Sequence, residues 1–208
     1  MGYRFTDLVD ACRDDWHAYI EHDFVLALGR GELADASFRH YLKQDYLFLL
    51  QFSRAYALAA YKSHSLDELR GAFDGMKTIL DVELGLHLAF CRDWGIGEAE
   101  LAELPEARAT LAYTRYVLDA GSRGDLLDLH VALAPCMVGY ADIARNLNAR
   151  PDTLRGADNP FDAWIAMYES DDFQAAARQE QAWLDDQLAQ VSGERFARLS
   201  RIFADATR

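Results

Sequence analysis

Apolar residues recur along the chain at intervals of three and four, which is the spacing that places them on one face of an α-helix. The clearest case is residues 38–62, with the sequence FRHYLKQDYLFLLQFSRAYALAAYK and neither Gly nor Pro. No stretch alternates apolar and polar residues over enough positions to form a strand. We therefore predict an all-α protein, in which long helices joined by short loops form a bundle.

The remaining helices are predicted from the same period and from the residues that bound it. Their ranges are 6–28, 65–94, 98–104, 108–120, 125–148, 160–169, 170–191 and 193–208. Ser65 and Glu68 have the spacing of a capping box, and Asn159 before Pro160 is typical of the start of a helix. Pro135 removes a backbone donor and predicts a kink inside the helix that holds it.

Asp45 is out of place in the 38–62 helix. It lies on the same face as Tyr41, Phe48 and Phe52, because offsets of three, four and seven residues stack along a helix. An unpaired buried charge is costly, so a carboxylate in an aromatic stripe needs a partner. Asp45 is therefore a candidate functional residue.

Composition narrows the class of protein. A chain of 208 residues is long enough for one well-filled domain, and we predict a single domain over 1–208. The net charge of -13, with no cluster of Lys and Arg, argues against nucleic acid as a partner. No apolar run approaches the roughly 20 residues that span a bilayer, and the start of the chain does not resemble a signal peptide. We predict a cytoplasmic protein with no membrane partner.

The three cysteines, Cys12, Cys91 and Cys136, are far apart and odd in number, which favours reduced thiols. Cys136 lies four residues before Tyr140, so thiol and phenol share a helix face. A buried structural cysteine is the ordinary interpretation, because a nucleophile needs a lowered pKa and a neighbour that organises the thiolate. No His is close to Cys136 in the sequence, so such a neighbour would have to come from the fold.

Two further groups of residues could carry chemistry. Tyr113, Tyr140 and Tyr168 lie in different helices among apolar residues, where they either pack as aromatics or line a pocket with their hydroxyls. Glu83 and His87 have the spacing by which one helix offers two ligands to a metal, as in di-iron bundles. A second ligand cluster is missing from the sequence, so we favour a hydrogen bond within the helix over a metal-dependent oxidase. No phosphate-binding glycine loop and no nucleophile elbow occurs.

Six segments of the chain, in order, resemble the TenA family, the thiaminase II or aminopyrimidine aminohydrolase proteins of the cysteine-containing type. They are FVLALGRGEL, FRHYLKQDYLFLLQFSRAYALAAYKS, ELGLHLAF, TLAYTRYVLDAG, LAPCMVGYADIARNL and NPFDAWIAMYES followed by DDF. The resemblance covers nearly the whole chain. It implies a single-domain helical bundle of the haem-oxygenase-like type, without haem and assembled as a homotetramer.

The resemblance also implies an activity in thiamin salvage. Members of the family hydrolyse 4-amino-5-aminomethyl-2-methylpyrimidine to the hydroxymethylpyrimidine and ammonia, and cleave thiamin, without a metal or organic cofactor. By this resemblance Cys136 is the nucleophile and Tyr113 lies against it. Asp45 holds the aminopyrimidine through its exocyclic amine and ring edge, so a ligand amine is its expected partner in place of a protein cation. Tyr140 contacts the pyrimidine through its hydroxyl, and Tyr168 stacks on it.

Two departures from the family pattern bear on activity. Phe48 occupies a position where some members have a tyrosine whose hydroxyl supports the thiolate. The family also has a C-terminal glutamate, the expected proton donor, which we expect just beyond Arg208. Either the sequence lacks the family's C-terminal end, or the protein lacks the donor and is slow; Asp205 has no motif that would make it a substitute. The alternative function is therefore a non-catalytic pyrimidine-binding or regulatory homologue.

Overall fold

The computed structural model describes residues 2–208, apart from the side chains of Leu86 and Asp93. Within this range every regular element is a helix, which confirms the predicted all-α class. The elements are α1 (Phe5–Ala11), α2 (Arg13–Ile20), α3 (Asp23–Gly29), α4 (Asp35–Lys62), α5 (Leu66–Thr78), the π-helix η1 (Ile79–Glu83), α6 (Leu84–Asp93), α7 (Glu98–Ala102), α8 (Arg108–Arg123), α9 (Leu126–Ala149), the 3-10 turn η2 (Gly156–Asp158), α10 (Asp162–Glu169), α11 (Asp171–Leu188) and α12 (Gly193–Thr207).

The chain divides into two compact units. The α4 unit is Ala34–Leu129, and the terminal unit combines the chain up to Leu33 with His130–Arg208. The single domain expected from the sequence stays a prediction.

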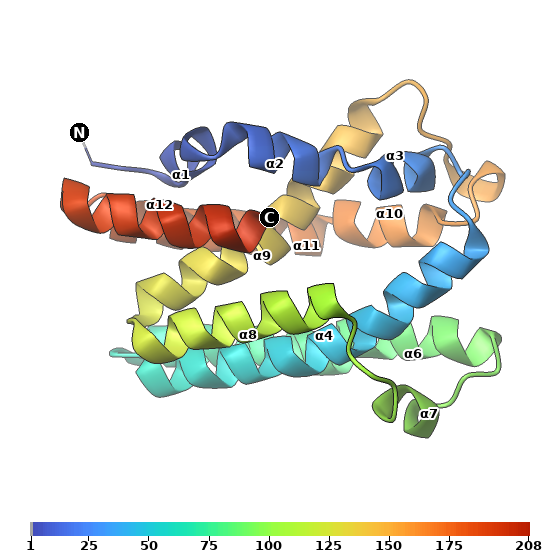
Figure 1. The fold of residues 1–208 in the computed structure, drawn as a ribbon, viewed down its shortest axis with the longest axis horizontal. Coiled ribbons are helices and arrows are strands. Elements are labelled where there is room, and N and C mark those ends of the chain that lie inside the picture. The colour runs from blue at the N-terminus through green and yellow to red at the C-terminus, as the bar shows by residue number, and fades with distance from the viewer. Residues whose placement is uncertain (1) are drawn as a thin grey trace. The chain divides into compact units, whose positions relative to one another are not determined.

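The α4 unit is organised around the helix from which it takes its name. Helix α4 confirms the predicted helix over 38–62 and begins three residues earlier, at Asp35. It packs against α5, α6 and α8, and Figure 1 shows α8 and α4 running side by side. Leu42, Leu49 and Phe52 are buried along its length, as the apolar period requires.

Close packing between α4 and α5 depends on one glycine. The capping box of Ser65 and Glu68 starts α5 as predicted. Further along α5, a Cβ at Gly75 would lie 2.3 Å from Cε1 of Tyr56 on α4. The absence of a side chain at Gly75 therefore lets the two helices approach.

The helix predicted over 65–94 is interrupted by a π turn. In η1 the Leu84 N–H donates to the Ile79 carbonyl, five residues earlier, before α6 resumes the α-helical pattern. The extra residue in this turn rotates all of α6 by about 100° relative to an uninterrupted helix. The π turn therefore decides which α6 side chains meet α4, a choice that the sequence period does not reveal.

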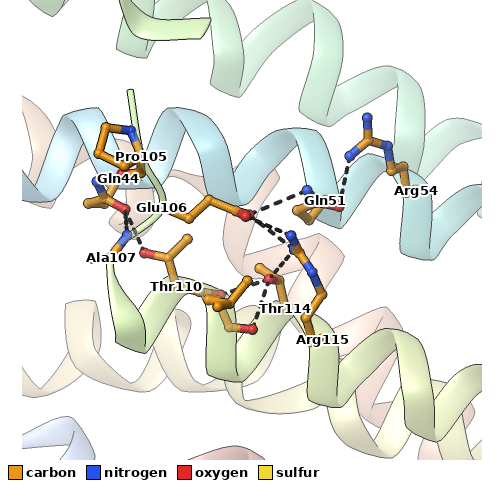
Figure 2. A network of polar contacts seen from close by, with 10 residues as sticks. Gln44, Gln51, Arg54, Pro105, Glu106, Ala107, Thr110, Thr114 and Arg115 are labelled. Carbon is orange, nitrogen blue, oxygen red and sulfur yellow. Dashed lines mark hydrogen bonds and ion pairs between the residues drawn. The ribbon is translucent and has the colours of Figure 1, made fainter. Parts of the chain in front are cut away.

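Polar side chains attach the start of α8 to α4, as Figure 2 shows. The amide oxygen of Gln44 accepts from the Ala107 N–H at 2.7 Å and from the Thr110 hydroxyl at 2.9 Å. Its amide nitrogen donates to the Pro105 carbonyl at 3.1 Å. The first of these bonds satisfies the backbone N–H of Ala107, the N-cap residue of α8. Gln44 therefore fixes α8 beside the turn of α4 that carries Asp45.

In the terminal unit the prediction of one helix over 6–28 is wrong. The structure has three helices there, α1, α2 and α3. The backbone leaves the helical conformation at Cys12, with φ -135° and ψ 39°. The ring of His22 then caps α3 by accepting from the Phe24 N–H at 3.1 Å. The ring of Phe203 on α12 lies 5.5 Å from Phe5 and 5.4 Å from Trp16, so α1 and α2 share one aromatic core with α12.

Asn159 does not start a helix as predicted. Its side-chain amide is buried and donates to the carbonyls of Leu28, Gly29 and Leu154 at 3.0–3.1 Å, while its Oδ1 accepts from the Phe161 N–H. Partners 130 and 131 residues away in the chain therefore outweigh the local capping pattern. Helix α10 begins two residues later than predicted.

Helix α9 also corrects a sequence prediction. Among the described residues it is long and apolar enough to cross a membrane, judged by length and composition alone, although no such run was expected. Of its most apolar window, 72% is buried inside the protein, as in the core helix of a soluble protein. Pro135 lies inside α9 without ending it.

Candidate functional site

Asp45 on α4 has partners within the protein. It is 8% exposed, and its Oδ2 accepts a hydrogen bond from the Tyr41 hydroxyl at 3.2 Å. The same oxygen lies 2.5 Å from Nε2 of His87 on α6. His87 is thus a protein partner that differs from the ligand amine expected from the sequence, and the ligand amine stays a prediction. The π turn explains the difference, since it determines the side of α6 on which His87 meets α4.

His87 is itself held from the opposite side of its ring. Its Nδ1 lies 2.8 Å from the carbonyl oxygen of Glu83, so the expected bond within the helix is present and uses the backbone of Glu83. Burial alone would lower the pKa of His87, but the charge of Asp45 and the hydrogen bonds outweigh it and raise the pKa. Burial and the negative charge of Asp45 also raise the pKa of Glu83 to about 7.

These contacts argue against a metal site at Glu83 and His87. A histidine binds a metal through a ring nitrogen, and both nitrogens of His87 are engaged. Among the described residues, no three His, Cys, Asp or Glu side chains gather in a way that could hold a metal ion. The polar cluster on α4 and α6 is better suited to holding a polar ligand edge or a proton.

Phe48 and Tyr113, two of the candidate residues, are in contact in the structure. Their ring centroids lie 5.9 Å apart at an interplanar angle of 29°, and Phe48 also stacks on Phe52 at 5.1 Å. They line a small apolar hollow of about 10 Å³ with Ala55 and Val117. That volume is roughly what one water molecule needs, so this hollow alone does not hold a pyrimidine ring.

Cys136 lies on α9 in the terminal unit and is half-buried. The Tyr19 hydroxyl donates to the carbonyl of Pro135 at 2.9 Å, and its ring passes so close to Gly139 that a Cβ there would lie 2.5 Å from it. These contacts fix the α9 backbone on both sides of Cys136. By contrast, burial raises the pKa of the Cys12 and Cys91 thiols and keeps them protonated.

Tyr140 and Tyr168 belong to one aromatic cluster. Their ring centroids are 4.8 Å apart, and Trp164 lies 6.0 Å from Tyr140 and 4.6 Å from Tyr168. Phe173 packs edge-on against Tyr168 at 4.9 Å. Since Tyr140 is one helical turn after Cys136, the half-buried thiol lies at the border of an aromatic surface.

Gln174 fixes this cluster and was missed in the sequence. Its buried amide nitrogen donates to the carbonyls of Ala141 at 3.2 Å and Tyr168 at 2.8 Å. Its oxygen accepts from Arg145 at 2.8 Å. One side chain of α11 thus joins the α9 backbone next to Tyr140 to the end of α10. The segment DDFQ offers no signal for this role, because the fold brings Gln174 to the Ala141 carbonyl, 33 residues away.

The six candidate residues thus fall into two sets, one in each unit. Asp45, Phe48 and Tyr113 lie in the α4 unit, and Phe48 contacts Tyr113 there. Cys136, Tyr140 and Tyr168 lie in the terminal unit, where the two tyrosine rings are in contact. The sequence suggests His87 as a metal ligand, but it does not reveal His87 as the partner of Asp45. Two features of the sequence could have identified this pair. Asp45 needs a partner, and His87 is the lone histidine in the apolar run LGLHLAF.

Known proteins are similar to this chain over nearly its whole length. Residues 9–208 match the TENA/THI-4/PQQC family. An uncharacterised protein of Haemophilus influenzae is 40% identical over 97% of this chain and 92% of its own. A protein of Halalkalibacterium halodurans named aminopyrimidine aminohydrolase is 35% identical over 98% of this chain and 90% of its own.

Among solved structures, one from a Silicibacter species superposes with a TM-score of 0.90 at 39% identity. It covers 99% of this chain and 92% of its own, and its description is a TenA family transcription regulator. The match over residues 9–208, with these relatives over nearly their full length, confirms the resemblance seen in the sequence. The chain belongs to the TENA/THI-4/PQQC family.

Proposed function

We propose that this protein is an aminopyrimidine aminohydrolase, a thiaminase II, of thiamin salvage. It hydrolyses 4-amino-5-aminomethyl-2-methylpyrimidine to the hydroxymethylpyrimidine and ammonia, and it cleaves thiamin by the same route. The observation that carries the proposal is a half-buried thiol, Cys136, one helical turn from Tyr140 at the edge of an aromatic cluster. The Halalkalibacterium relative, named for this activity, supports it.

The proposed chemistry starts at Cys136. A pyrimidine resists substitution until its aromaticity is interrupted, so the thiolate adds to a ring carbon, and the electron pair moves to a ring nitrogen that takes up a proton. Ammonia then leaves from the adjacent methylene, water adds in its place, and the Cys136–ring bond breaks to restore the aromatic ring. Covalent catalysis of this kind divides one difficult displacement into easier steps.

The other candidate residues orient the substrate and the thiolate. Asp45 accepts a hydrogen bond from the exocyclic amine and holds the adjacent ring edge, Tyr140 contacts the ring through its hydroxyl, and Tyr168 stacks on it. Phe48 adds aromatic contact, and Tyr113 supports the thiolate. Fixing a flat ring between aromatic side chains and one carboxylate supplies the orientation on which the addition depends.

Substitution of Cys136 tests the proposed nucleophile. Cys136→Ser is expected to abolish release of hydroxymethylpyrimidine, because a serine hydroxyl without a strong base is a much weaker nucleophile than a thiolate. Release is measured by chromatography with the aminomethylpyrimidine as substrate. Cys12→Ser is the matched control and should keep its activity, because its hydroxyl can still donate to the Leu8 carbonyl as the thiol does. A Cys136→Ser variant with near wild-type rates would contradict the proposal.

A second candidate function is a pyrimidine-binding or regulatory protein without catalysis. Phe48 favours it, since phenylalanine has no hydroxyl with which to support a thiolate. The Silicibacter relative described as a transcription regulator also supports it. Calorimetry with the aminomethylpyrimidine distinguishes the two functions, because tight binding by the full-length chain without turnover is expected only of the second.

The proposal includes a homotetramer in the cytoplasm that acts on a small molecule. Apolar side chains on α5 support assembly, because Leu66, Leu69 and Phe73 are spaced along one helical face and are 59%, 44% and 55% exposed. The net charge of -13 supports a partner other than nucleic acid.

A further inference from the structure

The contact between Asp45 and His87 is a buried pair of ionisable groups in the α4 unit. The Nε2–Oδ2 distance is 2.5 Å, and His87 is only 1% exposed. Removal of one partner from a buried charged pair leaves the other uncompensated, which is costly. The pair connects α6 to the turn of α4 that carries the candidate substrate-binding carboxylate.

The protons of this pair follow from its hydrogen bonds. A backbone carbonyl can only accept, so Nδ1 of His87 carries a hydrogen and donates it to Glu83. The short contact between Nε2 and Oδ2 then requires one proton between the two atoms. Either an imidazolium donates to a carboxylate, or a carboxylic acid donates to a neutral imidazole. Both arrangements have zero net charge.

The surroundings favour the imidazolium and the carboxylate. The Tyr41 hydroxyl donates to the same Oδ2, which stabilises negative charge on Asp45. Glu83, which also acts electrostatically on His87, favours positive charge on the ring when it is ionised. Because Tyr41 and His87 both contact Oδ2 of Asp45, we assign Oδ1 to the ligand.

We propose that His87 is a positioning residue that donates from Nε2 to Asp45, and so holds this carboxylate in the orientation and charge state that bind an aminopyrimidine edge. This inference rests on the proposed function, because it assigns the ligand of Asp45 from that function. An exocyclic amine presents donors to a carboxylate oxygen, and a carboxylate with a fixed torsion binds such an edge with less loss of conformational freedom. The π turn contributes by setting the side of α6 on which His87 lies.

Two amide variants separate this role from a purely structural one. In His87→Gln the side-chain nitrogen can take the place of Nε2 and donate to Asp45, but the bond to the Glu83 carbonyl is lost. In His87→Asn the nitrogen can take the place of Nδ1 and keep that bond, but it does not reach Asp45. The two variants therefore each retain one of the two contacts.

The measurements are KM and kcat with the aminomethylpyrimidine, and the Kd of the hydroxymethylpyrimidine by calorimetry. We expect His87→Gln to stay within about threefold of wild type in Kd and KM, and His87→Asn to lose at least about tenfold in both, as the loss of a charge-assisted hydrogen bond implies. An Asn variant equal to wild type, or a Gln variant as impaired as the Asn variant, would overturn the inference alone. Wild-type protein that neither binds nor hydrolyses these pyrimidines would overturn the proposed function and this inference with it.

Nitrogen NMR of the wild-type protein tests the same assignment without any variant that must fold. We expect one buried histidine with both ring nitrogens protonated at neutral pH, a signal that is absent from both variants. A neutral ring at His87 at neutral pH would contradict the inference.

Discussion

Glu83 and Asp45 are acidic residues that act on the same histidine. Asp45 receives hydrogen bonds from Tyr41 and from His87. Burial and the charge of Asp45 destabilise the ionised form of Glu83, and His87 offsets this effect only in part. The pKa of Glu83 is therefore raised from 4.5 to about 7. The folded protein therefore retains a proton on Glu83 that the unfolded chain releases near pH 4.5.

This difference predicts a pH-dependent stability. The folded state binds the additional proton between about pH 4.5 and 7, so the free energy of unfolding falls as the pH rises through this range. Glu83→Gln removes the ionisation and is expected to be more stable than wild type at pH 8, by at most about 3 kcal/mol, and similar to it near pH 4. Urea denaturation at the two pH values measures the difference.

Asp81→Asn is the control, because Asp81 is an exposed residue in the same π turn and pairs at the surface with Lys77. It should change stability little at either pH. A Glu83→Gln variant with the same stability advantage at both pH values would show that the effect does not arise from ionisation of Glu83.

At the scale of elements, α5 contains two glycines that differ in the space available for a side chain. A Cβ at Gly75 would meet the ring of Tyr56 on α4 at 2.3 Å, whereas a Cβ at Gly71 would meet nothing within 4 Å. The ring of Tyr56 is buried and cannot move away without disturbing the core. Of the two glycines, Gly75 is therefore the one required by packing.

Alanine substitutions test this difference within one helix. Gly75→Ala is expected to destabilise the protein by about 1–3 kcal/mol through overpacking. Gly71→Ala should stabilise it by about 0.5–1 kcal/mol, because alanine loses less backbone entropy in a helix. Thermal and urea unfolding of both variants give the comparison, and equal effects of the two substitutions would refute the role assigned to the Gly75–Tyr56 contact.

The helices that could be predicted from the sequence are those whose signals are local. The apolar period over 38–62 and the capping box at Ser65 both correspond to observed elements. The π turn ILDVE has no Gly or Pro, and its widened geometry accompanies packing against α4, so periodicity could not reveal it. Asn159 misled for a related reason, since two of its partners, the carbonyls of Leu28 and Gly29, are distant in the chain.

The candidate site, too, could be predicted from the sequence only in part. The identities of Asp45, Cys136 and the tyrosines came from their sequence context. The ring contacts of Phe48 with Tyr113 and of Tyr140 with Tyr168 come from the structure, because the residues of each pair lie on different helices. The partner of Asp45 could not be predicted, because it depends on the rotation that the π turn gives α6. The roles of these residues in binding and catalysis stay predictions.

For the whole molecule, the outward face of α5 is the feature that bears on assembly. Leu66, Leu69 and Phe73 expose apolar surface along this face, and Tyr61 near the end of α4 is 86% exposed. Apolar side chains grouped on one helix favour contact with another protein surface. A second copy of the chain is the occupant that the proposed homotetramer requires.

A charge on this face should prevent assembly. Phe73→Asp is expected to shift the protein from a tetramer to a smaller species, because a carboxylate would have to be desolvated at the interface. Light scattering coupled to size-exclusion chromatography measures the mass. Leu154→Asp is the control, since Leu154 is 43% exposed and lies outside α5. An unchanged mass for Phe73→Asp would exclude this face from the assembly.

The pairing of Asp45 with His87 also restricts how the sequence can diverge. Loss of either partner alone leaves a buried charge and costs about 3–5 kcal/mol, whereas replacement of both by well-packed apolar residues can be nearly neutral. Evolutionary change at one position therefore passes through a poorly folded intermediate unless the other changes with it. Relatives should tend to keep both residues or to have exchanged both, and a lineage that has exchanged both would have had to find another way to hold its ligand.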